Sequence, residues 1–436
     1  MGQQRVVTRA LFLRVARPGG NRLKKFAARS AQRGTRSLME GKARGPLRCG
    51  RPLEVTLNNV MTRRELLIGA PAAFSAGCRW RHRAPSGGYA FVANEDGQAI
   101  AAVDLTAFAV ARHIKLDGSP TAVAIHPKLP AVYALTPANG TLHEIEADRL
   151  SFRRKVTVCS TALSMRLAPN GESLYVLCRE PRRLVRVALD RLAVDARIAL
   201  PETPKDFDLD LEGRIAGVSF GDAGSLSFID LQRGICERPI QVGADVGAVR
   251  FRWDGEALIA ANLGRRMLSI YDTPSRKLVV HLPLAVRPDN LCFGGGGGQL
   301  FVTGDGMDAV VIVYPYITEV AKTVLAGRSP GPMAASSSPD YLFVTNPDSG
   351  GVTVLNIQTA RVMVVASVGA EPTYVAITKN SEYALVLNRK SGDMGVLWIE
   401  AITAIESSTL SKYKSAGLFT LIPVGSKPVS AALRTV

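Results

Sequence analysis

The stretch "LFVTNPDSGG", residues 342–351, is a short β-rich run that ends in turn-forming residues. Its first four letters recur at 300–303, and a looser copy, "AFVAN", stands at 90–94. A strand spelled the same way at intervals is typical of a repeat architecture, in which each copy belongs to one supersecondary unit. The spacing of the copies then decides the kind of repeat.

The copies recur every 42 residues. The residues at the middle of the runs form a series without a slip: Phe91, Tyr133, Tyr175, Gly217, Ile259, Phe301, Phe343 and Leu385. We call these eight positions the markers. A series of this length in unbroken register is very unlikely by chance.

Each unit contains four strand-like runs. In one unit these are "YLFVTN" (341–346), "VTVLNI" (352–357), "RVMVVASV" (361–368) and "TYVAIT" (373–378). Alternating apolar and polar residues between Gly, Pro, Asn and Asp clusters indicate half-buried antiparallel strands. Four short strands per unit of this length is the β-propeller arrangement. The sequence therefore predicts an all-β fold, a single β-propeller of four-stranded antiparallel blades over residues 88–436.

The two ends of the repeat region predict how the ring closes. We letter the strands of a blade A to D from the axis outward, with the marker on strand B. The region begins at strand B of Phe91, and "KPVSAALR" (427–434) reads as a strand A, so the two would share one blade. This closure removes exposed sheet edges and predicts eight blades. Seven blades remain the alternative, because residues 179–192 match the repeat poorly and residues 401–417 are an insertion.

Acidic residues recur 13 positions after four of the markers. They are Asp104, Glu146, Asp230 and Asp272. A short acceptor where a strand ends can bond nearby backbone N–H groups, so we predict turn formers rather than catalysts.

Four motifs carry a family resemblance: "FVTN" (343–346), "FVTG" (301–304), "FVAN" (91–94) and "LIPVGSKPVS" (421–430). They resemble the bacterial YVTN-repeat β-propeller family, and the resemblance covers residues 88–436. That family shares its fold with lactonase-type propellers, quinoprotein amine dehydrogenase β-chains and the haem d1 domain of nitrite reductase. The resemblance implies architecture first, with members often at the cell surface or in the periplasm, because fold alone does not give function.

The net charge of +17 lies almost wholly in the front of the chain. Residues 1–83 hold 19 Lys and Arg against 3 acids, whereas the remainder holds 35 bases and 34 acids. The propeller therefore has no basic footprint that would hold nucleic-acid phosphates, and we predict no nucleic-acid partner.

Residues 61–78, "MTRRELLIGAPAAFSAGC", have the charged, apolar and small-residue order of a secretory signal. Arg63 and Arg64 resemble a twin-arginine export signal. "SAGC" resembles a lipoprotein cleavage box with Cys78 as the lipidation site, although Ser75 replaces the usual Leu. The apolar run is shorter than the ~20 residues that span a membrane. We predict an exported protein, periplasmic or anchored to the cell envelope, that meets the membrane only through a lipid.

A signal that starts at residue 61 predicts that translation begins at Met61. Residues 1–60 are then an upstream reading-frame extension, and their Arg-rich, acid-poor composition agrees with this. A basic disordered arm or an organelle transit peptide is the alternative. Residues 79–87 are predicted to be a linker.

The cysteines and histidines predict no metal or cofactor site. Cys159, Cys178, Cys236 and Cys292 are scattered without C-x-x-C spacing, and free Cys is usually buried, so four core thiols are expected. A Cys159–Cys178 disulfide is the alternative. His126 stands alone beside Pro127 and reads as a turn residue. The run "FGGGGGQ" (293–299) has no helix after it and reads as a loop rather than a phosphate cradle.

The loops between strands B and C and between strands D and A meet at one mouth of the central channel. They are predicted to form a mixed-charge ring with net positive character, suited to a small acidic molecule, a carboxylated sugar or an acidic loop of a partner protein. The candidate ligand-binding residues are Arg179, Arg265, Arg287, Arg328, Arg389, Lys427, Asp305 and Glu371. The alternative is an ordinary solvated loop face.

Two functions from different classes follow. The first is a monomeric, non-catalytic binding or scaffold propeller of the cell envelope. The second is a lactonase-type hydrolase of an acidic or sugar-derived molecule, which would need positioned carboxylates or histidines for acid–base chemistry. A haem- or quinone-dependent relative is a weaker third possibility, because neither axial ligands nor attachment cysteines are evident.

Overall fold

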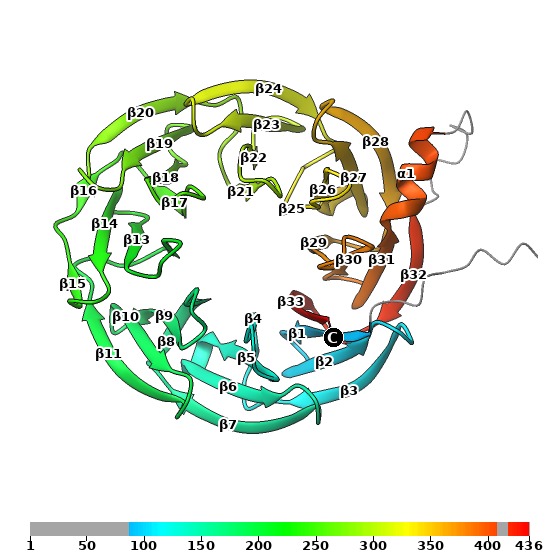
Figure 1. Ribbon diagram of the computed structural model, residues 1–436, viewed down its shortest axis with the longest axis horizontal. Helices are drawn as coiled ribbons and strands as arrows, with labels where there is room; N and C mark the ends of the chain where they lie inside the picture. Colours follow the sequence, from blue (N-terminus) through cyan, green and yellow to red (C-terminus); the bar gives the residue numbers. More distant parts are fainter. Residues whose placement is uncertain (1–86, 408–416, 436) are drawn as a thin grey trace, which may run out of the picture. The chain divides into compact units, whose positions relative to one another are not determined.

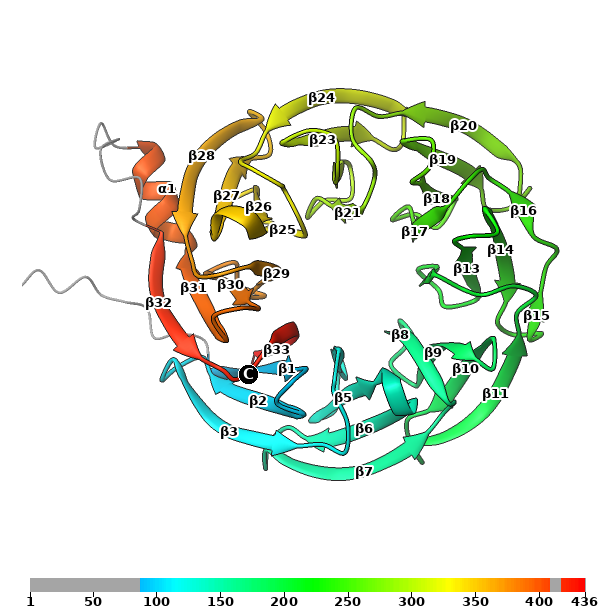
Figure 2. The same cartoon turned by 180° about the vertical axis from the view of Figure 1, so that it is seen from behind.

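The computed structural model describes residues 87–407 and 417–435. They form a ring of eight antiparallel blades, each built on four strands (Figure 1). The chain passes around the ring blade by blade, and strand A of every blade lies nearest the channel (Figures 1 and 2). The predicted all-β propeller with eight blades is confirmed.

In ring order from blade 1, the A strands are β33 (Pro428–Thr435), β4 (Ala122–Ile125), β8 (Thr161–Leu167), β12 (Asp206–Leu209), β17 (Val246–Phe251), β21 (Asn290–Phe293), β25 (Met333–Ala335) and β29 (Pro372–Ile377). The B strands are β1 (Gly88–Asn94), β5 (Ala131–Thr136), β9 (Ser173–Glu180), β13 (Ile215–Phe220), β18 (Ala257–Asn262), β22 (Leu300–Thr303), β26 (Tyr341–Asn346) and β30 (Tyr383–Asn388).

The C strands are β2 (Ala99–Asp104), β6 (Thr141–Glu146), β10 (Arg183–Ala188), β14 (Ser225–Asp230), β19 (Met267–Asp272), β23 (Ala309–Tyr314), β27 (Gly351–Asn356) and β31 (Asp393–Trp398). The outer D strands are β3 (Ala109–Lys115), β7 (Ser151–Thr157), β11 (Ala193–Ala199), β15 (Ile235–Cys236) with β16 (Ile240–Gln241), β20 (Leu278–Pro283), β24 (Glu319–Leu325), β28 (Arg361–Ser367) and β32 (Leu418–Pro423). Short 3-10 turns, η1 (Pro137–Asn139) and η2 (Pro347–Ser349), follow β5 and β26.

The markers lie on the B strands and pack against the next blade, which explains the unbroken period. Phe91 of β1 is fully buried in a cluster with Val132 of β5. Gly217 is the exception in size, because a Cβ there would lie 2.6 Å from Leu258 of the following blade. Leu258 supplies the volume that the glycine lacks, so the interface between these blades stays filled.

The ring closes as the sequence predicts. Strand β33 pairs antiparallel with β1, and Ala432 lies opposite Phe91. The Tyr374 hydroxyl of blade 8 also donates a 2.7 Å hydrogen bond to the carbonyl oxygen of Ala431. Residues near the two ends of the described chain thus share one blade, and the alternative of seven blades is wrong.

A buried asparagine ends four of the B strands and ties each to the loop that leads into its own blade. The Asn94 amide donates to the Val424 carbonyl at 2.8 Å, and the Asn388 amide donates to the Val368 carbonyl at 2.8 Å. The other two are Asn262 and Asn346. Gly425 follows Val424 with a φ of +125°, and a Cβ there would lie 2.8 Å from the Asn94 amide nitrogen. These contacts fix the D–A loops at the channel mouth.

Three of the four predicted turn formers act as such. Asp104 accepts hydrogen bonds from the backbone N–H groups of Thr106 and Ala107, and Asp230 and Asp272 make equivalent bonds. Glu146 makes no such bond within the described residues.

Two departures from the repeat have local causes. Strands β9 and β10 pair in unbroken register despite the poor match of residues 179–192 to the repeat. The insertion begins with helix α1 (Ile399–Ser407), whose Ile399 and Ile402 are buried against blade 7. None of the described helices is long and apolar enough to cross a membrane. The predictions on Met61, the signal at 61–78 with Arg63, Arg64 and Cys78, and most of the linker lie outside the described residues.

Candidate functional site

The B–C and D–A loops form one face of the propeller, which we call the mouth face. Its basic loop residues are Arg182, Lys205, Arg265, Arg266, Arg287, Arg328, Arg389, Lys390 and Lys427. Its acidic loop residues are Glu95, Asp96, Asp117, Glu202, Asp222, Asp245, Asp289, Asp305, Asp308, Asp348 and Glu371. Acids outnumber bases, so the net positive character predicted for the whole face is wrong.

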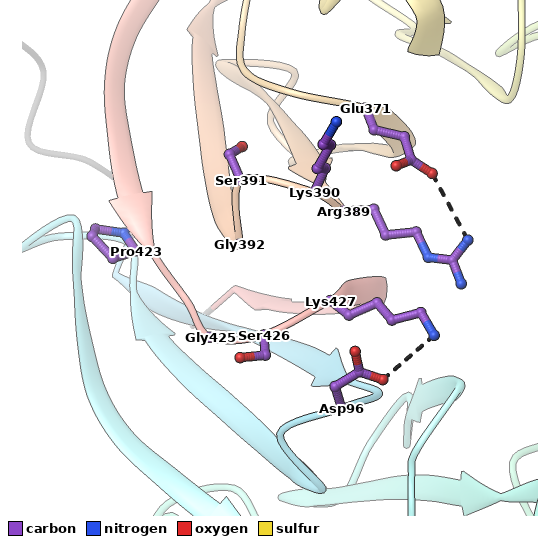
Figure 3. Close-up of a pocket in the computed structure, with 10 residues that line it drawn as sticks. All are labelled: Asp96, Glu371, Arg389, Lys390, Ser391, Gly392, Pro423, Gly425, Ser426 and Lys427. Atoms are coloured by element: carbon purple, nitrogen blue, oxygen red, sulfur yellow. Dashed lines mark hydrogen bonds and ion pairs between the residues drawn. The ribbon is translucent and has the colours of Figure 1, made fainter.

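Three of these basic residues, Arg389, Lys390 and Lys427, line a cavity of about 660 Å³ that opens on the mouth face between blades 8 and 1 (Figure 3). We call it the mouth pocket. It is lined by Asp96, Glu371, Arg389, Lys390, Ser391, Gly392, Pro423, Gly425, Ser426 and Lys427. Three of the predicted ligand-binding residues, Glu371, Arg389 and Lys427, are therefore brought together from three different loops.

Carboxylates equal the cations of the mouth pocket in number, with Glu95, Asp96 and Glu371 against Arg389, Lys390 and Lys427. Lys427 Nζ lies 3.0 Å from Glu95 Oε2 and 3.4 Å from Asp96 Oδ1. The hydrogen bond to Glu95, followed by that to Asp96, raises the pKa of Lys427 above its usual value. Arg389 Nη2 lies 3.3 Å from the same Glu95 oxygen, and its Nη1 lies 3.9 Å from Glu371 Oε1. Glu95 thus bridges the two cations, a role the sequence analysis missed.

Hydrogen-bond donors remain unused in this pocket. Within the described part of the chain, the Arg389 guanidinium makes one hydrogen bond, to Glu95, and its buried Nε has no partner. The Lys390 ammonium has no hydrogen bond or ion pair to any described residue. A guanidinium carries five N–H donors and an ammonium three, so the pocket retains charged donors for an anionic group.

Backbone hydrogen bonds hold the loops of the mouth pocket together. The Arg389 N–H donates to the Glu371 carbonyl at 2.8 Å, and the Glu95 N–H donates to the Lys427 carbonyl at 3.0 Å. Glu371 and Lys427 adopt left-handed backbone, with φ of +59° and +58°. Such conformations persist only where the surroundings impose them, so the pocket is preorganised.

A second cavity on the mouth face, of about 590 Å³, lies between blades 6 and 7 and is acidic. It is lined by Asp289, Asn290, Gly304, Asp305, Gly306, Met307, Asp308, Ser329 and Pro330. The predicted site residue Asp305 lies here, and Arg287 lies beside it with Nε 2.8 Å from Asp289 Oδ1. The hydrogen bond to Asp289 raises the pKa of Arg287. Arg179, Arg265 and Arg328 line neither cavity.

A cluster of charged side chains on the channel wall was also missed. Arg250 Nη1 of β17 bonds Asp206 Oδ2 of β12 at 2.6 Å. Arg166 of β8 approaches the same strand, with Nε 3.6 Å from Asp208 Oδ1. Burial raises the pKa of Asp208, against the lowering effect of Arg250 and Arg166. These ion pairs join blades 3, 4 and 5.

The repeat itself would have revealed that cluster. Arg166, Asp208 and Arg250 each lie nine residues before a marker, opposite it in the A–B pairing. The equivalent residues in the other blades are small: Cys292, Ala334, Ala376, Ala432 and Ala124. A charged residue at this same repeat position in three consecutive units could have revealed the cluster from the sequence.

In the part of the chain that the structure describes, no group of three or more His, Cys, Asp or Glu side chains is placed to hold a metal ion. His126 Nδ1 accepts the backbone N–H groups of Lys128 and Leu129, so it is the predicted turn residue. Cys159, Cys178, Cys236 and Cys292 are free thiols.

No protein-family model and no curated protein matches this chain. Solved propeller structures are similar in fold. The dihydro-haem d1 dehydrogenase NirN in complex with DHE has a TM-score of 0.63 at 13% identity, over 82% of this chain and 77% of that one. A functionally unknown protein from Desulfotomaculum acetoxidans has a TM-score of 0.53 at 14% identity, over 64% and 94%. The hydrazine synthase of Kuenenia stuttgartiensis has a TM-score of 0.51 at 14% identity, over 62% and 94%. At such identities the likeness shows the fold alone, that of a propeller, and some of these neighbours are enzymes.

Proposed function

We propose that the protein is a non-catalytic binding propeller of the YVTN-repeat type, whose mouth pocket takes a small molecule carrying a carboxylate, such as a sugar acid. The rigid ring supplies the scaffold, and the loops between blades 8 and 1 supply recognition. The ligand carboxylate would lie against Arg389 and Lys390.

The unused donors of Arg389 and Lys390 carry this proposal. A pocket in which every cation were already paired would gain little from an anion. Here a guanidinium with one hydrogen bond and an ammonium with none line the same 660 Å³ cavity. A carboxylate bound by two such groups makes charge-assisted hydrogen bonds, which are about twice as strong as neutral ones. The carboxylates of Glu95, Asp96 and Glu371 can accept hydrogen bonds from ligand hydroxyl groups, which favours a sugar acid over a simple anion.

We propose that this function belongs to a bacterial cell envelope. The support is the sequence pattern alone: Arg63 and Arg64 in an export signal, Cys78 as a lipid anchor, and Met61 as the translation start. In this proposal residues 1–60 are not part of the working protein, and the propeller acts as a monomer.

Calorimetric titration of the full chain with glucuronate and galacturonate tests the proposal, with glucose as the neutral control. We expect both uronates to bind, glucose not to bind, and the uronate Kd to rise between low and physiological salt, because partly exposed charges are screened. Absence of uronate binding, or equal binding of glucose, contradicts the proposal. If the protein hydrolyses a sugar lactone in the calorimeter, the lactonase-type hydrolase replaces the non-catalytic binding proposal.

A further inference from the structure

The face opposite the mouth carries exposed aromatic side chains in the neighbouring blades 5 and 6. Trp253, in the β17–β18 loop, is 50% exposed, and Tyr316, in the β23–β24 loop, is 47% exposed. Ile317 beside it is 64% exposed. Figure 2 shows the strands that these loops join in two neighbouring blades. We call Trp253, Tyr316 and Ile317 the aromatic ledge.

The glycine run of blade 6 forms the support of Trp253. Gly297 has a φ of +70°, and a Cβ there would lie 2.5 Å from the indole ring. The indole therefore rests directly on the backbone of the β21–β22 loop. Any larger residue at 297 would displace the indole. The packing of Trp253 therefore requires the glycine at this position of the run "FGGGGGQ".

Tyr316 is held from one side by Arg252. The Arg252 guanidinium carbon lies 4.6 Å from the centre of the Tyr316 ring, and its Nη1 bonds the Pro315 carbonyl at 3.5 Å. Asp254 holds the same guanidinium through bonds of 2.9 and 3.0 Å to Nε. Because one ring face is covered by a cation yet nearly half of the side chain is exposed, the remaining surface of the ring is presented to solvent. Contacts within the protein thus hold both aromatic rings of the ledge in place.

A small acidic hollow adjoins the ledge. A cavity of about 180 Å³ between blades 4 and 5 is lined by Asp210, Leu211, Glu212, Arg214, Ile215, Asp254, Gly255, Glu256, Thr273 and Pro274. Asp254 and Glu256 follow Trp253 in the same loop, and Asp254 bonds the Arg252 guanidinium that covers Tyr316, so the hollow borders the ledge. The Glu256 carboxylate has no hydrogen-bond or ion-pair partner among the described residues. The hollow is smaller than the ~300 Å³ at which ordinary ligand pockets begin, so it suits a group the size of one sugar.

We propose that the aromatic ledge and the acidic hollow bind a neutral polysaccharide. One sugar ring lies with its C–H face on Trp253 and Tyr316, and the next places its hydroxyl groups against Asp254 and Glu256. Aromatic rings supply apolar area at low entropic cost, and carboxylates accept hydrogen bonds from hydroxyl groups. A protein partner fits less well, because a standard interface needs about 800 Å² and some 20 residues per side. This site is separate from the mouth pocket and does not depend on it.

Affinity electrophoresis of the full chain in native gels containing hydroxyethyl cellulose, xyloglucan or laminarin tests the proposal. We expect at least one of these neutral polymers to retard the protein. Trp253→Ala and Tyr316→Ala should each weaken that retardation by about tenfold, the scale of one lost aromatic contact. Trp253→Phe should keep most of it. Leu129→Ala removes an exposed apolar side chain of another blade, so this variant should migrate as the wild type does.

Three results would overturn this assignment. The first is no retardation in any of the three polymers. The second is unchanged retardation of the Trp253→Ala and Tyr316→Ala proteins, with their folding checked by thermal unfolding. The third is a wild-type dimer in sedimentation that becomes a monomer in Trp253→Ala, since the ledge would then be a self-association surface.

Discussion

The side-chain amide of Asn94 donates a 2.8 Å hydrogen bond to the carbonyl oxygen of Val424, a residue 330 positions away in the chain. Asn94 ends the first B strand, and Val424 begins the loop that carries Lys427 into the mouth pocket. One buried contact therefore contributes both to the closure of the ring and to the placement of a pocket residue. Stability and ligand binding are expected to be linked at this point.

Asn94→Ala should destabilise the protein by about 1–3 kcal/mol, because the buried Val424 carbonyl loses its partner. Chemical denaturation measures this as a lower midpoint with an unchanged slope. Asn170→Ala is the matched control, since that exposed amide bonds only its neighbour Glu172, and its effect should stay within about 0.5 kcal/mol. Equal midpoints for wild type and Asn94→Ala would show that this hydrogen bond does not support the ring.

Removal of residues 428–436 should open the ring. The truncation takes away β33, exposes the edge of β1 and removes the Tyr374 contact to Ala431. We expect a loss on the scale of the whole net stability, about 5–15 kcal/mol, seen as aggregation or a much lower Tm in calorimetry. Removal of residues 1–60, which the sequence predicts to add no strand, is the control and should leave Tm unchanged. If the truncated protein has the same Tm as the full chain, closure through a shared blade is refuted.

Asp117 should make stability depend on pH in the acid range. Hydrogen bonds from Lys155 and then from His143 lower the pKa of Asp117 to about 2. The unfolded value is about 3.9, so the folded state favours the charged form, and this stabilisation is present above about pH 4 and lost as pH falls to 2. Urea midpoints of wild type and Asp117→Asn should therefore differ at pH 7 and converge near pH 2.

Asp222→Asn is the control for that experiment, because this exposed carboxylate has no charge partner among the described residues. The urea midpoint of Asp222→Asn should equal that of the wild type at every pH. A gap between wild type and Asp117→Asn that stays constant from pH 7 to pH 2 would exclude the ion pairs as its source.

Export tests the proposed location. Expression from Met61 should give a protein outside the cytoplasm, and Arg63→Lys with Arg64→Lys should block its export. Cell fractionation followed by mass spectrometry of the mature N-terminus measures both points. A Lys–Lys variant that is still exported, with an N-terminus other than Cys78, would refute the twin-arginine lipoprotein proposal.

The fold was predictable because every blade needs the same packing contacts at the same repeat positions. A marker such as Phe91 must fill the interface to the next blade, so strand, period and blade number follow from spacing. Helix α1 was not predicted, because it lies in the insertion, where the repeat imposes no pattern.

The candidate site was only partly predictable. The repeat places Arg389 and Lys427 on the mouth face, but which loops converge depends on side-chain reach and on the register of the ring closure. The bridging role of Glu95 needs the first and last blades side by side, and no local pattern shows that. The contact between Gly297 and Trp253 likewise joins two blades, so the sequence of the glycine run at 293–299 could not predict it.

The affinity of the mouth pocket for glucuronate, measured by calorimetry in wild type, Arg389→Gln and Lys390→Gln, tests the central claim most directly. Each variant removes one charged donor, a loss of about 1.5–3 kcal/mol, so each Kd should rise by about tenfold to a hundredfold. Arg182→Gln removes the same charge from the same face in blade 3, away from the pocket, and should change Kd by less than about twofold. If Arg182→Gln weakens binding as much as the other two, or if neither Arg389→Gln nor Lys390→Gln weakens it, the mouth pocket is not the binding site.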